Sequence, residues 1–193
     1  VPDSGVPSAI GYAETAKIPF ELGIIRNHYV GRTFIEPQQS IRALSVKLKH
    51  NANKILVDKK RVILIDDSIV RGTTSIKIVQ MMRDAGASEV HMRISAPPIA
   101  FPDFYGIDTP VQNQLLAAKN SLEEMQDYIG ADSLSFLSVD GLYKAMGHSS
   151  GRDPKLPAFT DHCFTGDYPT QLKDQNNNDH TKQLSLLYDL EKN

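Results

Sequence analysis

Two neighbouring carboxylates, Asp66 and Asp67, are the residues of this 193-residue chain with the clearest chemical potential. They follow the apolar run "VILI" (62–65) and precede "SIVRGTTS" (68–75), a segment of small hydroxyl-bearing residues and a glycine. Adjacent carboxylates repel each other, so a ligand must compensate them. A cation such as Mg²⁺ would do so, and so would the two vicinal hydroxyls of a ribose. The acid pair therefore predicts a metal-binding or sugar-binding site.

The segment after the acid pair has the composition of a phosphate-binding loop. It leads into a predicted helix, whose first N–H groups lack partners and whose dipole is positive at that end. Gly72 allows close backbone approach, and the hydroxyls of Ser68, Thr73 and Thr74 add donors. These features predict a cradle for a phosphate monoester. The alternative, on spacing alone, is that Asp66 only ends a strand and the hydroxyls only cap a helix.

Composition and motifs exclude several other classes. Hydrophobic residues are 40% and charged residues 23%, which is typical of a globular domain. The net charge of −2 gives no electrostatic basis for binding nucleic acid or a membrane surface. The patterns G-x-x-x-x-G-K-[ST] and G-x-G-x-x-G are absent, which disfavours P-loop nucleotidases and dinucleotide dehydrogenases. With one cysteine, no transmembrane run and no signal-like start, we expect a cytoplasmic protein.

The acid pair must be positioned by a βαβ unit. Residues 61–66 form a continuous apolar run typical of a strand buried on both faces. Residues 74–86 follow as a helix, with one apolar stripe and Gly86 suited to its C′ position. Residues 89–96 are the next strand, so the crossover is expected to be right-handed. The stripe consists of Ile78, Val79, Met82 and Ala85.

The remaining elements complete an α/β architecture with a mostly parallel central sheet flanked by helices. The patterns predict helices at 7–17, 121–130 and 139–147, strands at 20–26 and 133–138, and a long loop at 27–40. Ser121 and Glu124 form a capping-box pattern. We expect one domain over 1–148 and an irregular polar C-terminal extension over 149–193, with a short helix at 181–191. Because the chain starts without Met and Val1-Pro2 reads like the end of a strand, we also expect an upstream part to be missing, including the first strand of the domain.

Five motifs carry a resemblance to a known family. The segment "VILIDDSIVRGTTS" resembles the phosphoribosyl pyrophosphate (PRPP) signature of type I phosphoribosyltransferases. Together with "VPDSG", "NHYVGRTFI", "PPIAFPDFYGIDTP" and "IGADSLSFLSVDGL", in that order, it closely resembles the amidophosphoribosyltransferases. These are glutamine-dependent pentosyltransferases that begin purine synthesis. The resemblance covers about residues 1–147 and implies the type I phosphoribosyltransferase fold.

The resemblance assigns roles to particular residues. It implies that Mg²⁺ is held by Ser4, Asp66 and Asp67, with Asp3 beside the metal. It places Tyr29, Arg32 and Lys49 in the catalytic machinery, on a closing loop and on a basic loop. The substrate-binding residues that it implies are Asp3, Ser4, Asp66, Asp67, Ser68, Arg71, Gly72, Thr73 and Thr74.

The chemistry of the implied reaction agrees with these roles. Ammonia displaces pyrophosphate from PRPP, so negative charge grows on the leaving group, and Mg²⁺, Arg32 and Lys49 are suited to stabilise it. The implied mechanism places Tyr29 near the cationic sugar of the transition state. The alternative is that Tyr29 is an aromatic residue of the loop that packs on the core. Phe34 and Ile35 either line an ammonia passage, as in the family, or anchor the loop.

Departures from the family limit what the chain is expected to do. Nothing in it resembles the glutaminase domain, so we expect it to use ammonia and not glutamine. We expect no iron–sulfur cluster, because Asp103 stands at one cysteine-ligand position and only Cys163 remains of the others. Cys163 is interpreted as inert, and His148, His162 and His180 as surface residues. Purine nucleotides are expected as inhibitors, and the protein is expected to be a homo-oligomer.

Two other functions stay open from the sequence. One is a phosphoribosyltransferase that salvages a nucleobase, although no base-specific loop is evident. The other is a non-catalytic regulator that senses PRPP or a nucleotide. A sensor is expected to lose the cations on the pyrophosphate side, whereas Arg32 and Lys49 are present here.

Overall fold

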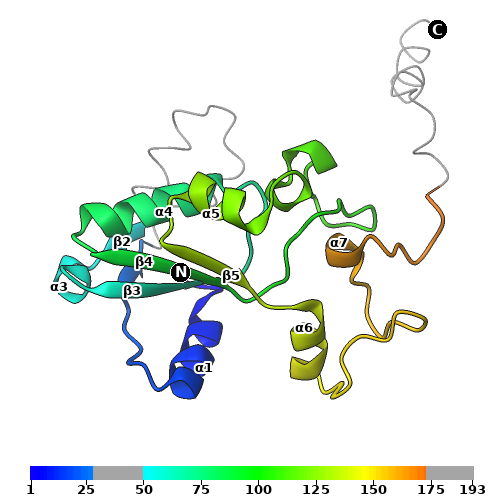
Figure 1. The fold of residues 1–193 in the computed structure, drawn as a ribbon, viewed down its shortest axis with the longest axis horizontal. Helices are drawn as coiled ribbons and strands as arrows, with labels where there is room; N and C mark the ends of the chain where they lie inside the picture. Colours follow the sequence, from blue (N-terminus) through cyan, green and yellow to red (C-terminus); the bar gives the residue numbers. More distant parts are fainter. Residues whose placement is uncertain (28–49, 173–193) are drawn as a thin grey trace, which may run out of the picture.

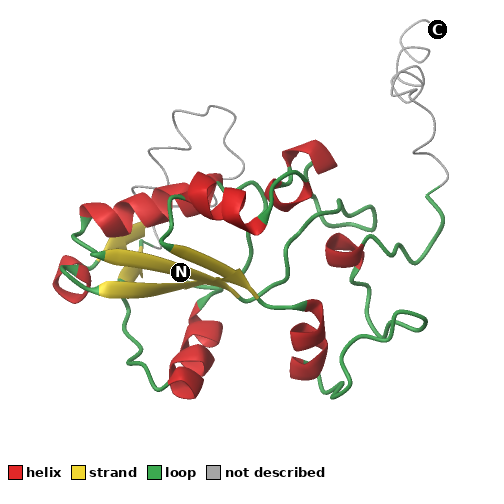
Figure 2. Ribbon diagram, in the orientation of Figure 1, coloured by secondary structure: helices red, strands yellow, loops and turns green. Residues whose placement is uncertain are grey.

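The computed structural model describes residues 1–27 and 50–172, and its centre is a parallel sheet with helices on both faces (Figures 1 and 2). This confirms the predicted α/β class. The elements, in chain order, are α1 (Val6–Ala16), β1 (Ile24–Arg26), β2 (His50–Ala52), α3 (Lys54–Val57), β3 (Arg61–Asp66), α4 (Thr73–Asp84), β4 (Glu89–Ile94), the 3₁₀ turns η2 (Gln112–Gln114) and η3 (Leu116–Ala118), α5 (Leu122–Ile129), β5 (Ser133–Phe136), α6 (Val139–Ala145) and α7 (His162–Thr165).

The sheet has the strand order β3-β4-β5, and both pairings are parallel. Arg61 pairs with Glu89 and Asp66 with Ile94, so the carboxyl ends of the two strands are level with each other. Alternate residues of β4 are buried, beginning with Val90, because successive side chains point to opposite faces of a strand. This register places the acid pair at the edge of the sheet where open α/β folds bind ligands.

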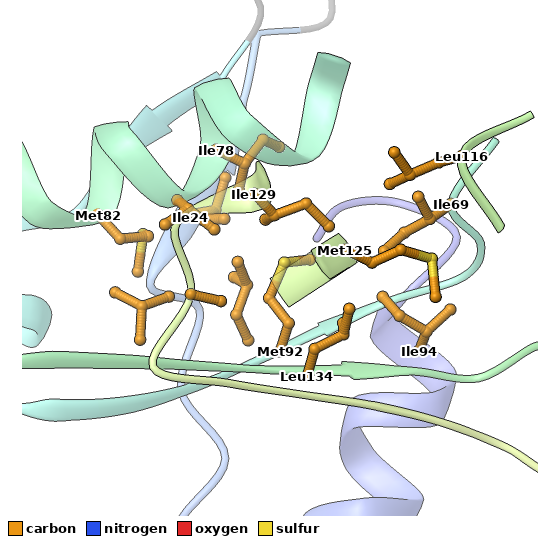
Figure 3. Packing of buried hydrophobic residues seen from close by; sticks show 14 of the residues in the cluster. Ile24, Ile69, Ile78, Met82, Met92, Ile94, Leu116, Met125, Ile129 and Leu134 are labelled. Atoms are coloured by element: carbon orange, nitrogen blue, oxygen red, sulfur yellow. The ribbon is translucent and has the colours of Figure 1, made fainter. Parts of the chain in front are cut away.

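One face of the sheet supports most of the core. Helices α4 and α5 lie on that face, while α1 and α6 lie on the opposite one (Figure 1). The apolar stripe of α4 packs against β4 and α5, so burial of that stripe fixes the helix behind the acid pair (Figure 3). The residues labelled in this cluster are Ile24, Ile69, Ile78, Met82, Met92, Ile94, Leu116, Met125, Ile129 and Leu134.

Local signals for the helix ends agree with the structure. Gly86 follows the C-cap of α4 with φ of 99°, a left-handed conformation that glycine adopts at little cost. At the start of α5, the Ser121 hydroxyl accepts from the Glu124 amide at 3.2 Å. The Glu124 carboxylate accepts from the Ser121 amide at 2.7 Å. The predicted capping box is therefore confirmed.

A second, smaller sheet was missed by the sequence reading. Strands β1 and β2 pair antiparallel, with Ile24 opposite Ala52 and Arg26 opposite His50. The predicted strand at 20–26 is confirmed only over its last three residues. The predicted loop at 27–40 and helix at 181–191 lie wholly or largely outside the described residues.

A buried polar contact attaches the segment after α6 to an earlier part of the chain. His162 in α7 is only 4% exposed, and its Nε2 lies 2.7 Å from Asp103 Oδ1. Its interpretation as a surface residue is therefore wrong, and the reason is a partner 59 positions away in the sequence. His148 is exposed, as expected, and lies edge-on to the ring of Tyr143. His180 lies outside the described residues.

In the two described ranges, every helix is too short or too polar to cross a membrane.

Candidate phosphoribosyl site

The acid pair lies at the carboxyl end of β3. Asp66 is the last residue of the strand and is 6% exposed, whereas Asp67 is exposed. The Asp67 amide donates to Asp66 Oδ1 at 3.0 Å, and the amide and hydroxyl of Ser95 both donate to the Asp66 carbonyl. Ser95 directly follows β4, so the neighbouring strand fixes the backbone under the pair. One carboxylate is thus held rigidly inside the fold and the other faces the solvent.

The electrostatics of Asp66 disfavour its charged form. Burial raises the pKa of its carboxyl to about 7, and the negative charge of Asp67 adds to the effect. The Val1 ammonium and the Asp67 amide act in the opposite direction but do not cancel it. A carboxylate in this state is stabilised by a divalent cation or by hydroxyl donors, so the donor set fits Mg²⁺.

The loop after the acid pair is held in place by core packing and by a backbone hydrogen bond. Ile69 is buried in the core cluster, and the Leu116 amide donates to the Val70 carbonyl at 2.8 Å. Gly72 has φ of 75°, and a Cβ at this position would lie 2.8 Å from Leu116 Cδ2 and 3.1 Å from the ring of Tyr128. Glycine is therefore required here, both for the backbone conformation and for the close packing.

Within residues 1–27 and 50–172, the first amides of α4 have no hydrogen-bond partner. Its N-cap is Gly72, which supplies no side-chain hydrogen bond to the first turn. Thr73 is exposed and Thr74 half-buried, so their hydroxyls are accessible next to these amides. The Ser68 amide, by contrast, donates to Asp67 Oδ1 at 2.7 Å. An anion at the mouth of α4 would meet free N–H groups and the positive end of the helix dipole.

Arg71 is held by a residue that sequence reasoning missed. Its Nε and Nη2 donate to Gln114 Oε1 at 3.2 and 3.0 Å. Gln114 closes η2, in the long connection between β4 and α5. No local pattern marks this glutamine, because the two partners are 43 positions apart. The contact orients the one cation that the loop itself carries.

The N-terminal loop lies against the same end of β3. The Val1 amine donates to the Ile65 carbonyl, and a Cβ on Gly5 would lie 2.8 Å from that same oxygen. The structure therefore brings the Asp3–Ser4 loop and the acid pair to one end of the strand. Asp3 and Ser4 are both exposed, and Asp3 forms a salt bridge with Arg26 of β1. Arg26 is a second contact residue that no sequence pattern marks.

The predicted closing loop and basic loop lie outside the described residues. This applies to Tyr29, Arg32, Phe34, Ile35 and Lys49. Their assignment rests on the resemblance of the motifs alone.

A separate group of donor atoms lies in the C-terminal part of the described chain. Asp103, His162 and Cys163 each offer a ligand atom within 4.8 Å of the others. Both carboxylate oxygens of Asp103 already accept hydrogen bonds, Oδ1 from His162 and Oδ2 from the amides of Tyr105 and Ile107. These bonds favour a structural role for the group. With one sulfur, it also lacks the four thiolates that an iron–sulfur cluster requires.

The type I phosphoribosyltransferase class is defined by a combination of features. These are a parallel sheet, an acid pair at the end of a strand, and a helix behind the pair whose first amides can bind a ligand. Solved structures with this fold include PRPP amidotransferases. The enzyme from Bacillus subtilis, complexed with ADP and GMP, matches with a TM-score of 0.78 and 53% identity, over 90% of this chain and 38% of that one. The structure described as the allosteric regulatory enzyme of purine biosynthesis gives a TM-score of 0.76 and 52% identity, over 91% of this chain and 37% of that one.

Sequence relatives lead to one family. An amidophosphoribosyltransferase of Rhizobium etli is 63% identical over 188 residues, which is 97% of this chain and 38% of the relative. That of Bacillus subtilis is 52% identical over 186 residues, which is 96% of this chain and 39% of the relative. No family model matches the chain. Nearly the whole chain is thus homologous to the C-terminal portion of the amidophosphoribosyltransferases, and it spans about two fifths of their length.

Proposed function

We propose that this chain is the phosphoribosyltransferase part of an amidophosphoribosyltransferase. In this reaction ammonia displaces pyrophosphate from PRPP and gives 5-phosphoribosylamine, at the first step of purine synthesis. The observation that carries the proposal is the buried carboxylate of Asp66 beside the exposed, like-charged Asp67, directly in front of a helix whose N-cap residue, Gly72, supplies no side-chain hydrogen bond. Relatives at 63% and 52% identity, both amidophosphoribosyltransferases by name, support it.

In this proposal each part of the site has one task. Asp66 and Asp67 accept hydrogen bonds from the ribose hydroxyls and, with Ser4, hold Mg²⁺, which when bound neutralises charge on the departing pyrophosphate. The first amides of α4, with Thr73 and Thr74, bind the 5-phosphate. The contacts to the ribose hydroxyls and to the 5-phosphate involve parts of the substrate that do not react. They therefore position the anomeric carbon without contacting it.

The nucleophile needs little activation by the protein. Ammonia is already nucleophilic in its neutral form, so this chain's task is to position the sugar and exclude water. In the proposed full-length protein, a glutaminase domain supplies the ammonia, consistent with relatives more than twice as long as this chain. Arg32 and Lys49 are proposed to stabilise the leaving pyrophosphate, and Tyr29 to lie near the sugar.

Purine nucleotides are proposed as competitors at the same site. The solved B. subtilis enzyme is described as complexed with ADP and GMP. A nucleoside monophosphate carries the same ribose 5-phosphate that Asp66, Asp67 and the mouth of α4 are suited to hold. Such a nucleotide is therefore expected to raise the KM for PRPP without lowering kcat.

The test is pyrophosphate release from PRPP and Mg²⁺ on addition of ammonia, with the 193-residue chain and the full-length protein side by side. Release that depends on ammonia in either protein supports the proposal, and Asp67→Asn is expected to lower it at least about 100-fold. Asp84→Asn, an exposed aspartate at the opposite end of α4, is the matched control and is expected to retain activity.

Two results would overturn the proposal. Release that requires a purine base instead of ammonia would identify a salvage enzyme. PRPP binding without turnover in the full-length protein would identify a sensor.

A further inference from the structure

The C-terminal part of the described chain is attached to the long connection between β4 and α5 (Figure 1). In α7, the Cys163 carbonyl accepts from the amides of Ala100 and Phe101 at 3.0 and 3.1 Å. The Tyr168 hydroxyl donates to the Pro102 carbonyl at 2.9 Å, across 66 positions of sequence. These bonds hold the first residues of the connection against α7 and the residues that follow it.

A buried pair lies at the centre of this attachment. The side chains of His162 and Asp103 are 5% and 2% exposed, and His162 Nε2 donates to Asp103 Oδ1 at 2.7 Å, because an ionised carboxylate can only accept. The other oxygen of Asp103 accepts from the amides of Tyr105 and Ile107. The Asp103 amide donates to the Thr109 hydroxyl at 2.6 Å. His162 therefore fixes the residue that organises this turn of the connection.

The turn leads directly to the contact with the phosphate-binding loop. Its next residue is Pro110, whose ring holds φ at about −65° and restricts the residue before it, so the link is stiff. Gln114 follows and accepts from Arg71 at 3.2 and 3.0 Å. Two positions later, the Leu116 amide donates to the Val70 carbonyl at 2.8 Å. A displacement of the turn would therefore move the residues that hold the phosphate-binding loop.

We propose that His162 is a positioning residue of the phosphoribosyl site, which acts through Asp103 to fix Gln114 against Arg71. The histidine does not contact the substrate in this role. It keeps the guanidinium of Arg71, a group suited to phosphate, in one orientation before the substrate arrives. The inference rests on the proposed function, because PRPP is the ligand that this loop is proposed to bind. It gives the chain beyond residue 148 a part in substrate binding.

The first test is the KM for PRPP of full-length variants in the ammonia-dependent assay. His162→Ala removes the donor to Asp103 and is expected to raise the KM about three- to tenfold with kcat unchanged, as for loss of the Gln114 contact. His162→Gln keeps an N–H donor and is expected to restore the KM. His148→Ala, which removes an exposed histidine, is the matched control and is expected to leave the KM unchanged. An unchanged KM in a folded His162→Ala protein would overturn the inference.

A double variant separates positioning from general support of the fold. If His162 acts through Gln114, both alanine substitutions remove the same contact, and the double variant should have the KM of Gln114→Ala alone. A KM raised by the product of the two single effects would overturn the inference. If His162→Ala does not fold, Tyr168→Phe replaces it, because it removes only the hydroxyl bonded to Pro102. It should raise the KM about threefold alone and add nothing to Gln114→Ala, and any other result would overturn the inference.

Hydrogen exchange distinguishes failure of this inference from failure of the proposed function. The bond from the Leu116 amide to Val70 can be followed without substrate. His162→Ala is expected to speed exchange of the Leu116 amide at least about tenfold, with the amide of the buried Met92 in β4 unchanged as the control for global unfolding. Equal Leu116 exchange in variant and wild type would overturn the inference. If the wild type does not turn over PRPP, the proposed function fails, and faster Leu116 exchange in His162→Ala would still support the positioning role.

Discussion

Two buried carboxylates of this molecule lie in opposite environments. Asp66 is 6% exposed and has a like charge, Asp67, as its neighbour. Asp161 is 4% exposed and accepts from the Tyr143 hydroxyl at 2.7 Å and from Arg152 Nε at 2.6 Å, with Thr165 as a further donor at 3.1 Å. Both residues are buried, but Asp161 accepts hydrogen bonds from three side chains, whereas in the described part of the chain the Asp66 carboxylate accepts from the Asp67 amide.

The pKa shifts of the two carboxyls reflect this difference. Burial dominates at Asp66 and raises its pKa to about 7. Burial also acts to raise the pKa of Asp161, but hydrogen bonds from Arg152, Tyr143 and Thr165 outweigh it, and the pKa is lowered. A buried acid with every lone pair used stabilises the fold. A buried acid left beside another acid is destabilised in its charged form, which is typical of a ligand-binding site.

The strongest test of this contrast is Asp161→Ala. Removing one partner of a buried ion pair leaves the Arg152 charge uncompensated, so the free energy of unfolding should fall by about 3–5 kcal/mol. Denaturant unfolding measures this loss. Asp153→Ala, at an exposed position of the same segment, should change stability by no more than about 0.5 kcal/mol. Similar midpoints for the two variants would show that Asp161 is not a structural residue.

Asp66→Asn should behave in the opposite way. The amide keeps an acceptor for the Asp67 N–H while the buried like charge disappears, so the unfolding free energy should stay the same or rise. Affinity for PRPP with Mg²⁺ should fall at least about 100-fold. Calorimetric titration and denaturant unfolding of the same preparation give both quantities. A variant that loses stability and keeps its affinity would reverse the roles assigned to the two acids.

The pH dependence sharpens the comparison further. The pKa of Asp66 rises from 3.8 to about 7 on folding, so its contribution to stability is greatest at low pH and is lost as pH rises through this window. Cation binding requires the charged form, so affinity for PRPP with Mg²⁺ should fall about tenfold between pH 8 and pH 6. Asp66→Asn experiences the same titration of the ligand and is the control. An equal pH effect in both proteins would assign it to the ligand.

The smallest effect is expected at an exposed contact. Gln114→Ala removes the acceptor that orients Arg71, and one exposed hydrogen-bonded pair contributes little. The KM for PRPP should rise about three- to tenfold with kcat unchanged, and Gln114→Glu, which keeps an acceptor, should restore it. Gln112→Ala, in the same 3₁₀ turn, should have no effect. A loss of kcat in Gln114→Ala would show that this contact supports more than binding.

Elements of the fold could be predicted from the sequence where the residues that determine them lie close together in the chain. The apolar run of β3, the stripe of α4 and the capping box of α5 each lie within a dozen residues, and the structure confirms all three. The acid pair could be placed at the sheet edge for the same reason, because it directly follows its strand.

Long-range polar contacts could not be predicted in this way. Gln114 meets Arg71 across 43 positions, and Asp103 meets His162 across 59. Gln114 is not distinctive in type or spacing, and His162 was interpreted as a surface residue, because their partners Arg71 and Asp103 lie far away in the sequence. The short strand β2 was missed for a related reason. Its residues, His50–Ala52, have weak strand propensity and are ordered by pairing with β1.

The start of α4 at Gly72 has a consequence for how this chain would respond to the proposed substrate. Helix α5 completes its own first turn with two side chains, whereas α4 begins at a glycine and leaves that turn unfinished. A bound phosphate would supply the missing acceptors and act as the cap of the helix. Substrate would then be a part of the secondary structure, and its departure would leave the first turn of α4 to fray.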